Sequence, residues 1–70
     1  MTTYRALRSY QLNSNFVPIN YVKQNEIIGV EFNPHQDTYH ILRTETMGHL
    51  AGWGVEISES DLLNYFKKEA

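Results

Sequence analysis

The sequence predicts a single, mostly β domain with a short helical segment near its C-terminal end. Three observations lead to this fold class: short runs in which apolar and polar residues alternate, turn-forming residues between those runs, and a change of period after residue 57. A chain of 70 residues has room for one core, so we expect residues 1–70 to form one domain. Apolar residues at 41% and charged residues at 20% are ordinary for a folded domain and argue against disorder.

The first expected strand covers residues 4–12, where apolar side chains recur at one parity although Arg8 interrupts that face. Residues 13–25 are expected to form a long loop, because the run begins with polar turn-forming residues and because Pro18 has no N–H to donate to a strand ladder.

Residues 26–32 form the clearest expected strand. Ile28, Val30 and Phe32 alternate with polar or small residues and should share one buried face. Gly29 lies inside this strand, which indicates either a bulge or the close approach of another backbone.

Two further strands are expected at residues 38–44 and 53–57, each preceded by turn-forming residues. In the second of these, Trp53, Val55 and Ile57 have the parity that should point inward.

The period changes at Ser58, which fits a helix N-cap with Asp61 three residues further on. Two continuations fit the residues that follow. One is a helix with an apolar face that extends to Phe66, and the other is a single helical turn followed by a short closing strand at residues 62–66.

Composition and charge narrow the classes of function and location. The chain has no cysteine, and therefore neither a disulfide framework nor a thiolate metal site. Its net charge is −2 and its basic residues are scattered, so nucleic-acid binding is not expected. It shows no signal-peptide pattern and no apolar run of membrane-spanning length, so we expect a cytoplasmic protein that does not bind a membrane.

The order of these segments carries a family resemblance. Residues 6–10, Ala-Leu-Arg-Ser-Tyr, stand where one family has the pattern ALYDY, and residues 19–28 are similar to its segment L-S-F-K-K-G-D-I-I. Residues 52–62 are similar to its last hairpin strand, short helical turn and closing strand. Over residues 4–66 the chain thus resembles Src homology 3-like domains. This implies a small barrel of about five strands with a short helical turn or helix near the C-terminus.

The chain departs from the peptide-binding members of that family in several places. Only Tyr10 matches the two tyrosines of the first motif, because Arg8 replaces the other. The acidic residues of the family's first loop, the tryptophan after its second loop and the proline of its helical turn are also missing. The resemblance therefore implies a bacterial or phage relative that kept the barrel and does not bind polyproline in the usual way.

No pattern of catalytic, metal-binding or cofactor-binding residues emerges. His35, His40 and His49 lack the short spacing of metal ligands, and Ser58 and Ser60 are better explained as helix-capping residues than as nucleophiles. The four glycines do not form a phosphate-binding loop. We therefore expect a protein that is not an enzyme and holds neither a metal nor a cofactor.

The remaining expectation is a protein-interaction module, such as a small adaptor or inhibitor, that binds a protein or peptide through aromatic and loop surface. The residues expected to make that surface are Tyr10, Phe16, Tyr39 and Trp53. Two positions remain open for Trp53, one in the core and one exposed as an interface anchor.

Two other hypotheses remain open. A nucleic-acid-binding small barrel would require Arg5, Arg8, Lys23 and Arg43 to converge in space. Self-association would use the exposed edge of the strand at residues 26–32. We expect a monomer or a weak homodimer.

Overall fold

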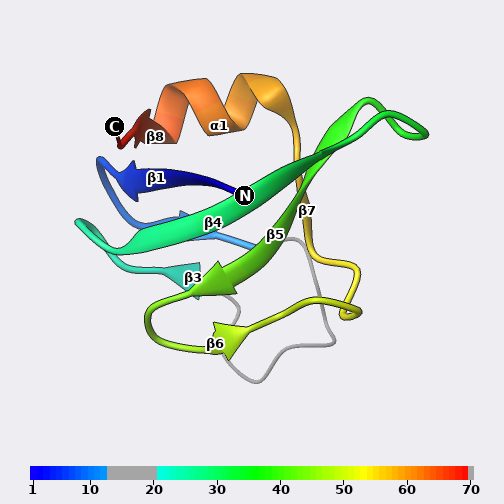
Figure 1. The fold of residues 1–70 in the computed structure, drawn as a ribbon. Helices are drawn as coiled ribbons and strands as arrows, with labels where there is room; N and C mark the ends of the chain where they lie inside the picture. The colour runs from blue at the N-terminus through cyan, green and yellow to red at the C-terminus, as the bar shows by residue number, and fades with distance from the viewer. Residues whose placement is uncertain (13–20, 70) are drawn as a thin grey trace.

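The computed structural model describes residues 1–12 and 21–69. Figure 1 shows the main sheet with a short helix lying across one end of it. The predicted mostly β class is confirmed, with 49% of the described residues in strands and 11% in the helix. The elements in these residues are β1 (Thr2–Ala6), β2 (Tyr10–Gln11), β3 (Tyr21–Val22), β4 (Ile27–Asn33), β5 (Thr38–Thr44), β6 (Gly48–His49), β7 (Glu56–Ile57), α1 (Glu59–Tyr65) and β8 (Phe66–Lys68).

The main sheet is antiparallel and has the strand order β6-β5-β4-β1-β8. β7 pairs with β5 as well, near the start of that strand, whereas β6 pairs with its end. β2 and β3 form a separate two-stranded ladder. The first strand of the chain thus lies between β4 and the last strand, β8. Within the described residues the main sheet is open, with β6 and β8 at its two ends.

The core collects side chains from the main sheet, from the β2–β3 ladder, from α1 and from the connection between β6 and β7. Alternation along β4 and β5 turns one face of the sheet toward this core, and the β2–β3 ladder and α1 contribute the residues that pack against it. The buried apolar residues are Ala6, Tyr10, Leu12, Val22, Ile28, Val30, Ile41, Leu50, Val55, Ile57, Leu62 and Phe66.

A bulge interrupts the β4–β5 ladder, as the glycine in β4 indicated. Gly29 pairs with Arg43 but the next residue, Val30, pairs with Ile41, so Leu42 has no partner on β4. The extra residue reverses the parity of β5 beyond it. Ile41 is therefore buried while Arg43, which has the same parity in sequence, is exposed on the outer face.

The structure corrects two strands. The strand expected at residues 4–12 is divided into β1 and β2 by residues 7–9, and the strand expected at residues 53–57 is reduced to β7. The inward orientation expected for Phe32 and Trp53 is wrong, because their exposed fractions are 46% and 45%. Phe32 lies next to the last residue of β4, beside the turn to β5, and Trp53 lies in a turn rather than in a strand. Figure 1 shows that this end of the β4–β5 hairpin projects from the rest of the sheet.

The expected N-cap is confirmed, and the two continuations after it each prove correct in part. Ser58 Oγ accepts a hydrogen bond of 3.1 Å from the backbone N–H of Asp61. The helix continues to Tyr65, and Phe66 then adopts extended backbone angles and pairs with Ala6. A helix and a closing strand therefore both form, and the strand begins at Phe66 rather than at residue 62.

Candidate functional site

Tyr10 connects the β2–β3 ladder to α1 and lies mostly inside the molecule. It is 8% exposed, and its hydroxyl donates a hydrogen bond of 2.6 Å to Asp61 Oδ2. Its ring meets those of Tyr65 and Phe66 edge to face, with centroids 4.9 and 5.7 Å apart. Burial raises the pKa of Tyr10, and the Asp61 carboxylate raises it further, so the hydroxyl stays protonated. Tyr10 thus presents little surface to a partner.

Next to Tyr10, a cation–aromatic contact forms the accessible part of this corner. The Arg8 guanidinium lies 4.4 Å from the centroid of the half-buried Tyr65 ring, and Arg8 also donates to the carbonyl of Asn64 at 3.4 Å. Tyr65 follows Asp61 by four residues on α1, so one helical turn brings both side chains to Tyr10. The Arg8 guanidinium thus covers this aromatic ring.

Tyr39 belongs to a second aromatic contact, at the end of the β4–β5 hairpin. It pairs with Phe32 across the two strands, and their rings meet edge to face with centroids 5.3 Å apart. Desolvation and the nearby Glu59 carboxylate raise the pKa of Tyr39. Phe32 is not among the residues predicted for the site. A hairpin turn at residues 33–37 places Phe32 directly opposite Tyr39, so the sequence does contain a signal for this pair.

Trp53 projects from the connection between β6 and β7. Its backbone N–H donates to the carbonyl of Leu50 at 3.0 Å, which closes a turn. Gly52 and Gly54 flank it with φ values of 88° and 70°, the left-handed region that glycine adopts without steric cost. Of the two positions left open for Trp53, the structure shows the exposed one.

The predicted site residues that the structure describes are not joined to one another by aromatic contacts. Phe16 lies outside the described residues. Among the described residues, Tyr10 contacts the rings of Tyr65 and Phe66, and Tyr39 contacts the ring of Phe32. No aromatic pair there links Tyr10, Tyr39 or Trp53 to another of these three. The Phe32–Tyr39 pair and the Trp53 turn hold the accessible members of this set, and Tyr21 on β3 is a further exposed aromatic residue.

A polar network braces the hairpin end from the outer face of the sheet. Glu56 Oε1 accepts hydrogen bonds from Thr38 Oγ1 at 2.5 Å and from Asn33 Nδ2 at 3.1 Å, and His40 Nε2 lies 3.4 Å away. These two donors lower the pKa of Glu56. Among the described residues no three histidine, aspartate or glutamate side chains gather as metal ligands. The hydrogen bonds of Glu56 connect β7 to the hairpin end.

Three of the four basic residues of the nucleic-acid hypothesis serve different parts of the molecule. Arg5 Nε lies 2.6 Å from Glu69 Oε1, and Arg5 also donates to the carbonyl of Asn25. Arg8 stacks on an aromatic ring, and Arg43 lies on β5, two strands away from Arg5.

The strand edge invoked for self-association is not free. β4 pairs with β1 on one side and with β5 on the other, so the expectation of an exposed edge on this strand is wrong.

Comparison of the chain with protein-family models, with curated proteins and with solved structures gave no match. No helix in the part of the chain that the structure describes is long and apolar enough to cross a membrane.

Proposed function

We propose that this chain is a non-catalytic protein-interaction domain, a small adaptor or inhibitor, that docks a protein or peptide through Trp53 and the Phe32–Tyr39 pair. The observation that carries the proposal is the exposed indole of Trp53, flanked by two left-handed glycines. Tryptophan and tyrosine are enriched among the residues that dominate binding energy at interfaces. An indole exposed on a short turn costs little entropy to bind, because its backbone is already ordered.

We further propose a divergent Src homology 3-like fold of bacterial or phage type in a cytoplasmic protein. The strand order supports the fold, since the first strand pairs with both the long β4 and the closing strand β8. The helical element between β7 and β8 lies at the place that the resemblance implies.

The accessible aromatics argue for a partner other than polyproline. A polyproline ligand needs stacked aromatic ridges on which its rings lie. Tyr10 is buried with its hydroxyl bonded to Asp61, and Arg8 covers Tyr65. Phe32 at the hairpin end and Trp53 on its turn are among the aromatic residues that stay exposed.

The test is a pull-down with the tagged chain from host lysate, with nuclease and high salt present, in which Trp53→Ala and Tyr39→Ala are compared with the unaltered chain. Leu63→Ala is the matched control, because Leu63 is a large apolar residue that is 64% exposed on α1. We expect a stoichiometric protein partner that both aromatic variants lose and the control retains. Retention by both aromatic variants would contradict the site, and recovery of nucleic acid alone would contradict the proposed function.

A further inference from the structure

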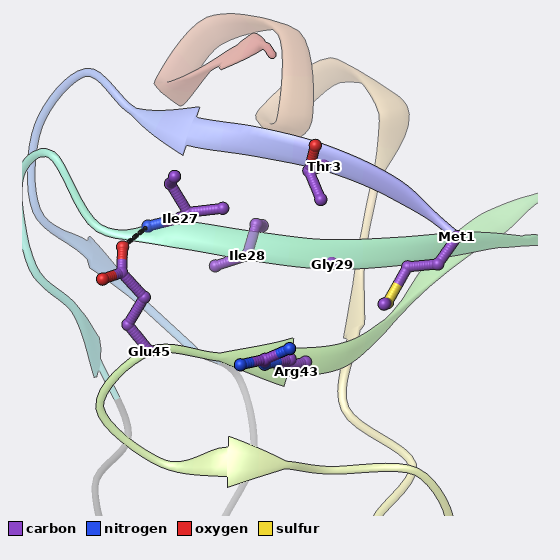
Figure 2. A pocket seen from close by; sticks show the side chains of 7 residues that line it. All are labelled: Met1, Thr3, Ile27, Ile28, Gly29, Arg43 and Glu45. Atoms are coloured by element: carbon purple, nitrogen blue, oxygen red, sulfur yellow. Dashed lines mark hydrogen bonds between the residues drawn. The ribbon is translucent and has the colours of Figure 1, made fainter. Parts of the chain in front are cut away.

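The outer face of the main sheet carries a hollow of about 240 Å³ over Gly29, seen from close by in Figure 2. Thr3 on β1 and Arg43 on β5 are the register partners of Gly29, so the three positions lie side by side across the sheet. The φ of Gly29 lies outside the left-handed region, so its backbone does not require glycine. The missing side chain is what leaves the floor of this hollow open.

The walls of the hollow are largely apolar. Ile27 is half-buried on one side, and the Met1 side chain extends over Gly29, with its thioether where a β-carbon at position 29 would stand. Met1 is 70% exposed, so few contacts hold it there. The hollow thus already accommodates one unbranched apolar side chain, and that side chain is free to move aside.

One side of the hollow carries a cation with no anionic partner among the described residues. The ion pairs in that part of the chain involve Arg5 and His40, not Arg43, whose exposed guanidinium lines the hollow. Glu45 lines the same hollow, but its Oε1 accepts a hydrogen bond of 2.6 Å from the backbone N–H of Ile27 rather than pairing with Arg43. Arginine can donate two parallel N–H hydrogen bonds to one carboxylate, so the pair gains geometric specificity in addition to charge attraction.

We propose that this hollow binds a peptide segment in which an aliphatic side chain such as leucine or methionine adjoins an aspartate or glutamate. The apolar side chain lies on Gly29 in place of Met1, and the carboxylate pairs with Arg43. A volume of about 240 Å³ is below the range of roughly 300–1,000 Å³ typical of cofactor and drug-sized ligands, and it suits a single side chain. The hollow opens on the outer face of the sheet, away from the core, so this second site does not depend on the aromatic one.

The test is a titration of the ¹⁵N-labelled protein, followed by NMR, with the capped peptide acetyl-Ser-Leu-Glu-Ser-amide. We expect saturable shifts at the Gly29 amide and its strand neighbours. Arg43→Gln should weaken binding about fivefold, as loss of an exposed charge pair does. Gly29→Ala should weaken it about tenfold, because its added methyl group fills the floor. Lys68→Gln removes the same charge from β8 and should leave the affinity unchanged.

Gly29→Ala is a gentle probe, because the new β-carbon meets only the flexible end of Met1 and the amide spectrum reports whether the fold persists. The companion peptides Ser-Leu-Gln-Ser and Ser-Ala-Glu-Ser, capped in the same way, should each bind more weakly than the parent. Shifts that avoid the hollow, or binding that survives both substitutions, would overturn the proposal. If hexanoate bound equally well, the ligand would be a small carboxylate rather than a peptide. If the shifts grew with protein concentration alone, the occupant would be a second copy of the chain.

Discussion

The two ends of the β4–β5 hairpin follow the same alternating pattern but differ in what covers them. At the covered end, Ile28, Val30 and Ile41 are buried to 1% exposure or less, because the core packs against them. At the free end, Phe32 and Tyr39 have the inward parity but are less buried, since Phe32 is 46% exposed and Tyr39 is half-buried against the edge of the core. Alternation thus identifies the side chains that share a face, whereas their depth depends on elements that distant parts of the chain supply.

Each end also has one carboxylate that accepts several hydrogen bonds. Near the covered end, Glu26 is buried and accepts the backbone N–H groups of Lys23 at 2.9 Å and Thr46 at 2.8 Å, so it joins two turns. At the free end, Glu56 accepts side-chain donors from Asn33 and Thr38. The first carboxylate replaces missing backbone partners, and the second fixes the shape of a hairpin end.

The largest difference between the ends should appear on truncation of their apolar side chains. Ile41→Ala should lower the free energy of unfolding by about 2–5 kcal/mol, because it leaves a cavity in the core. Phe32→Ala should lower it by about 1 kcal/mol or less, because the ring is already half in water. Urea denaturation at neutral pH measures both changes. Equal losses would mean that the free end is packed as tightly as the covered one.

Glu26→Gln should have the next largest effect, roughly 2 kcal/mol, because two backbone N–H groups lose a charged acceptor. Burial alone would raise the pKa of Glu26, but the N–H groups of Thr46 and Lys23 outweigh it and lower the pKa below its usual value. A lowered folded-state pKa gives stability that is fully present above the unfolded pKa and is lost as the pH falls through the folded one. Unfolding measured from neutral to acid pH should therefore show a shallower loss in Glu26→Gln. Glu31→Gln, at an exposed position of β4, is the control and should keep the original acid dependence.

Tyr10→Phe should lower the free energy of unfolding by about 1 kcal/mol, since it removes the hydroxyl that bonds Asp61 and keeps the ring contacts. A double-mutant cycle with Asp61→Asn, measured by thermal unfolding, should show that the two losses are not additive. Tyr21→Phe removes a hydroxyl from an exposed tyrosine and serves as the control. Additive losses would show that the bond contributes nothing to stability.

The smallest effect is expected at the free end. Glu56→Gln should change global stability less than any substitution above, because the polar network lies near solvent. It should instead speed hydrogen exchange of the turn amides at residues 35–37 and leave the exchange of Ile41 unchanged. Because Thr38 and Asn33 lower the pKa of Glu56, acid should produce the same local loosening as the carboxylate is protonated. Faster exchange at Ile41 would mean that the Glu56 carboxylate stabilises the whole domain rather than the hairpin end alone.

Much of the fold could be predicted because residues close in sequence determine where several of its strands and its helix begin and end. β5 has the expected limits, since turn-forming residues precede it and its alternation is regular. Ser58 caps α1 because its hydroxyl and the N–H of Asp61 are close in sequence. The orientation of Arg43 could not be predicted, because the bulge that reverses it lies in the pairing with β4 and leaves no mark in β5 itself.

Less of the candidate site could be predicted. A strand at residues 53–57 would turn Trp53 inward, but Gly52 and Gly54 turn the chain there instead. The contact between Tyr10 and Tyr65 joins residues 55 positions apart, through the topology of the sheet and the helix. No local pattern carries such information, so the aromatic corner could be found only from the fold.

The position of β1 between β4 and β8 has a consequence for how the chain folds. Arg5 pairs with Lys67, and Glu69 donates its N–H to the carbonyl of Thr3, so the sheet joins segments more than 60 residues apart in a 70-residue chain. Closing such a loop costs conformational entropy before the contacts between the two segments can stabilise the structure. A topology of this kind typically folds in roughly milliseconds to seconds rather than microseconds. Until the last strand arrives, β1 has only one neighbour, so the final residues complete a structure that the first residues begin.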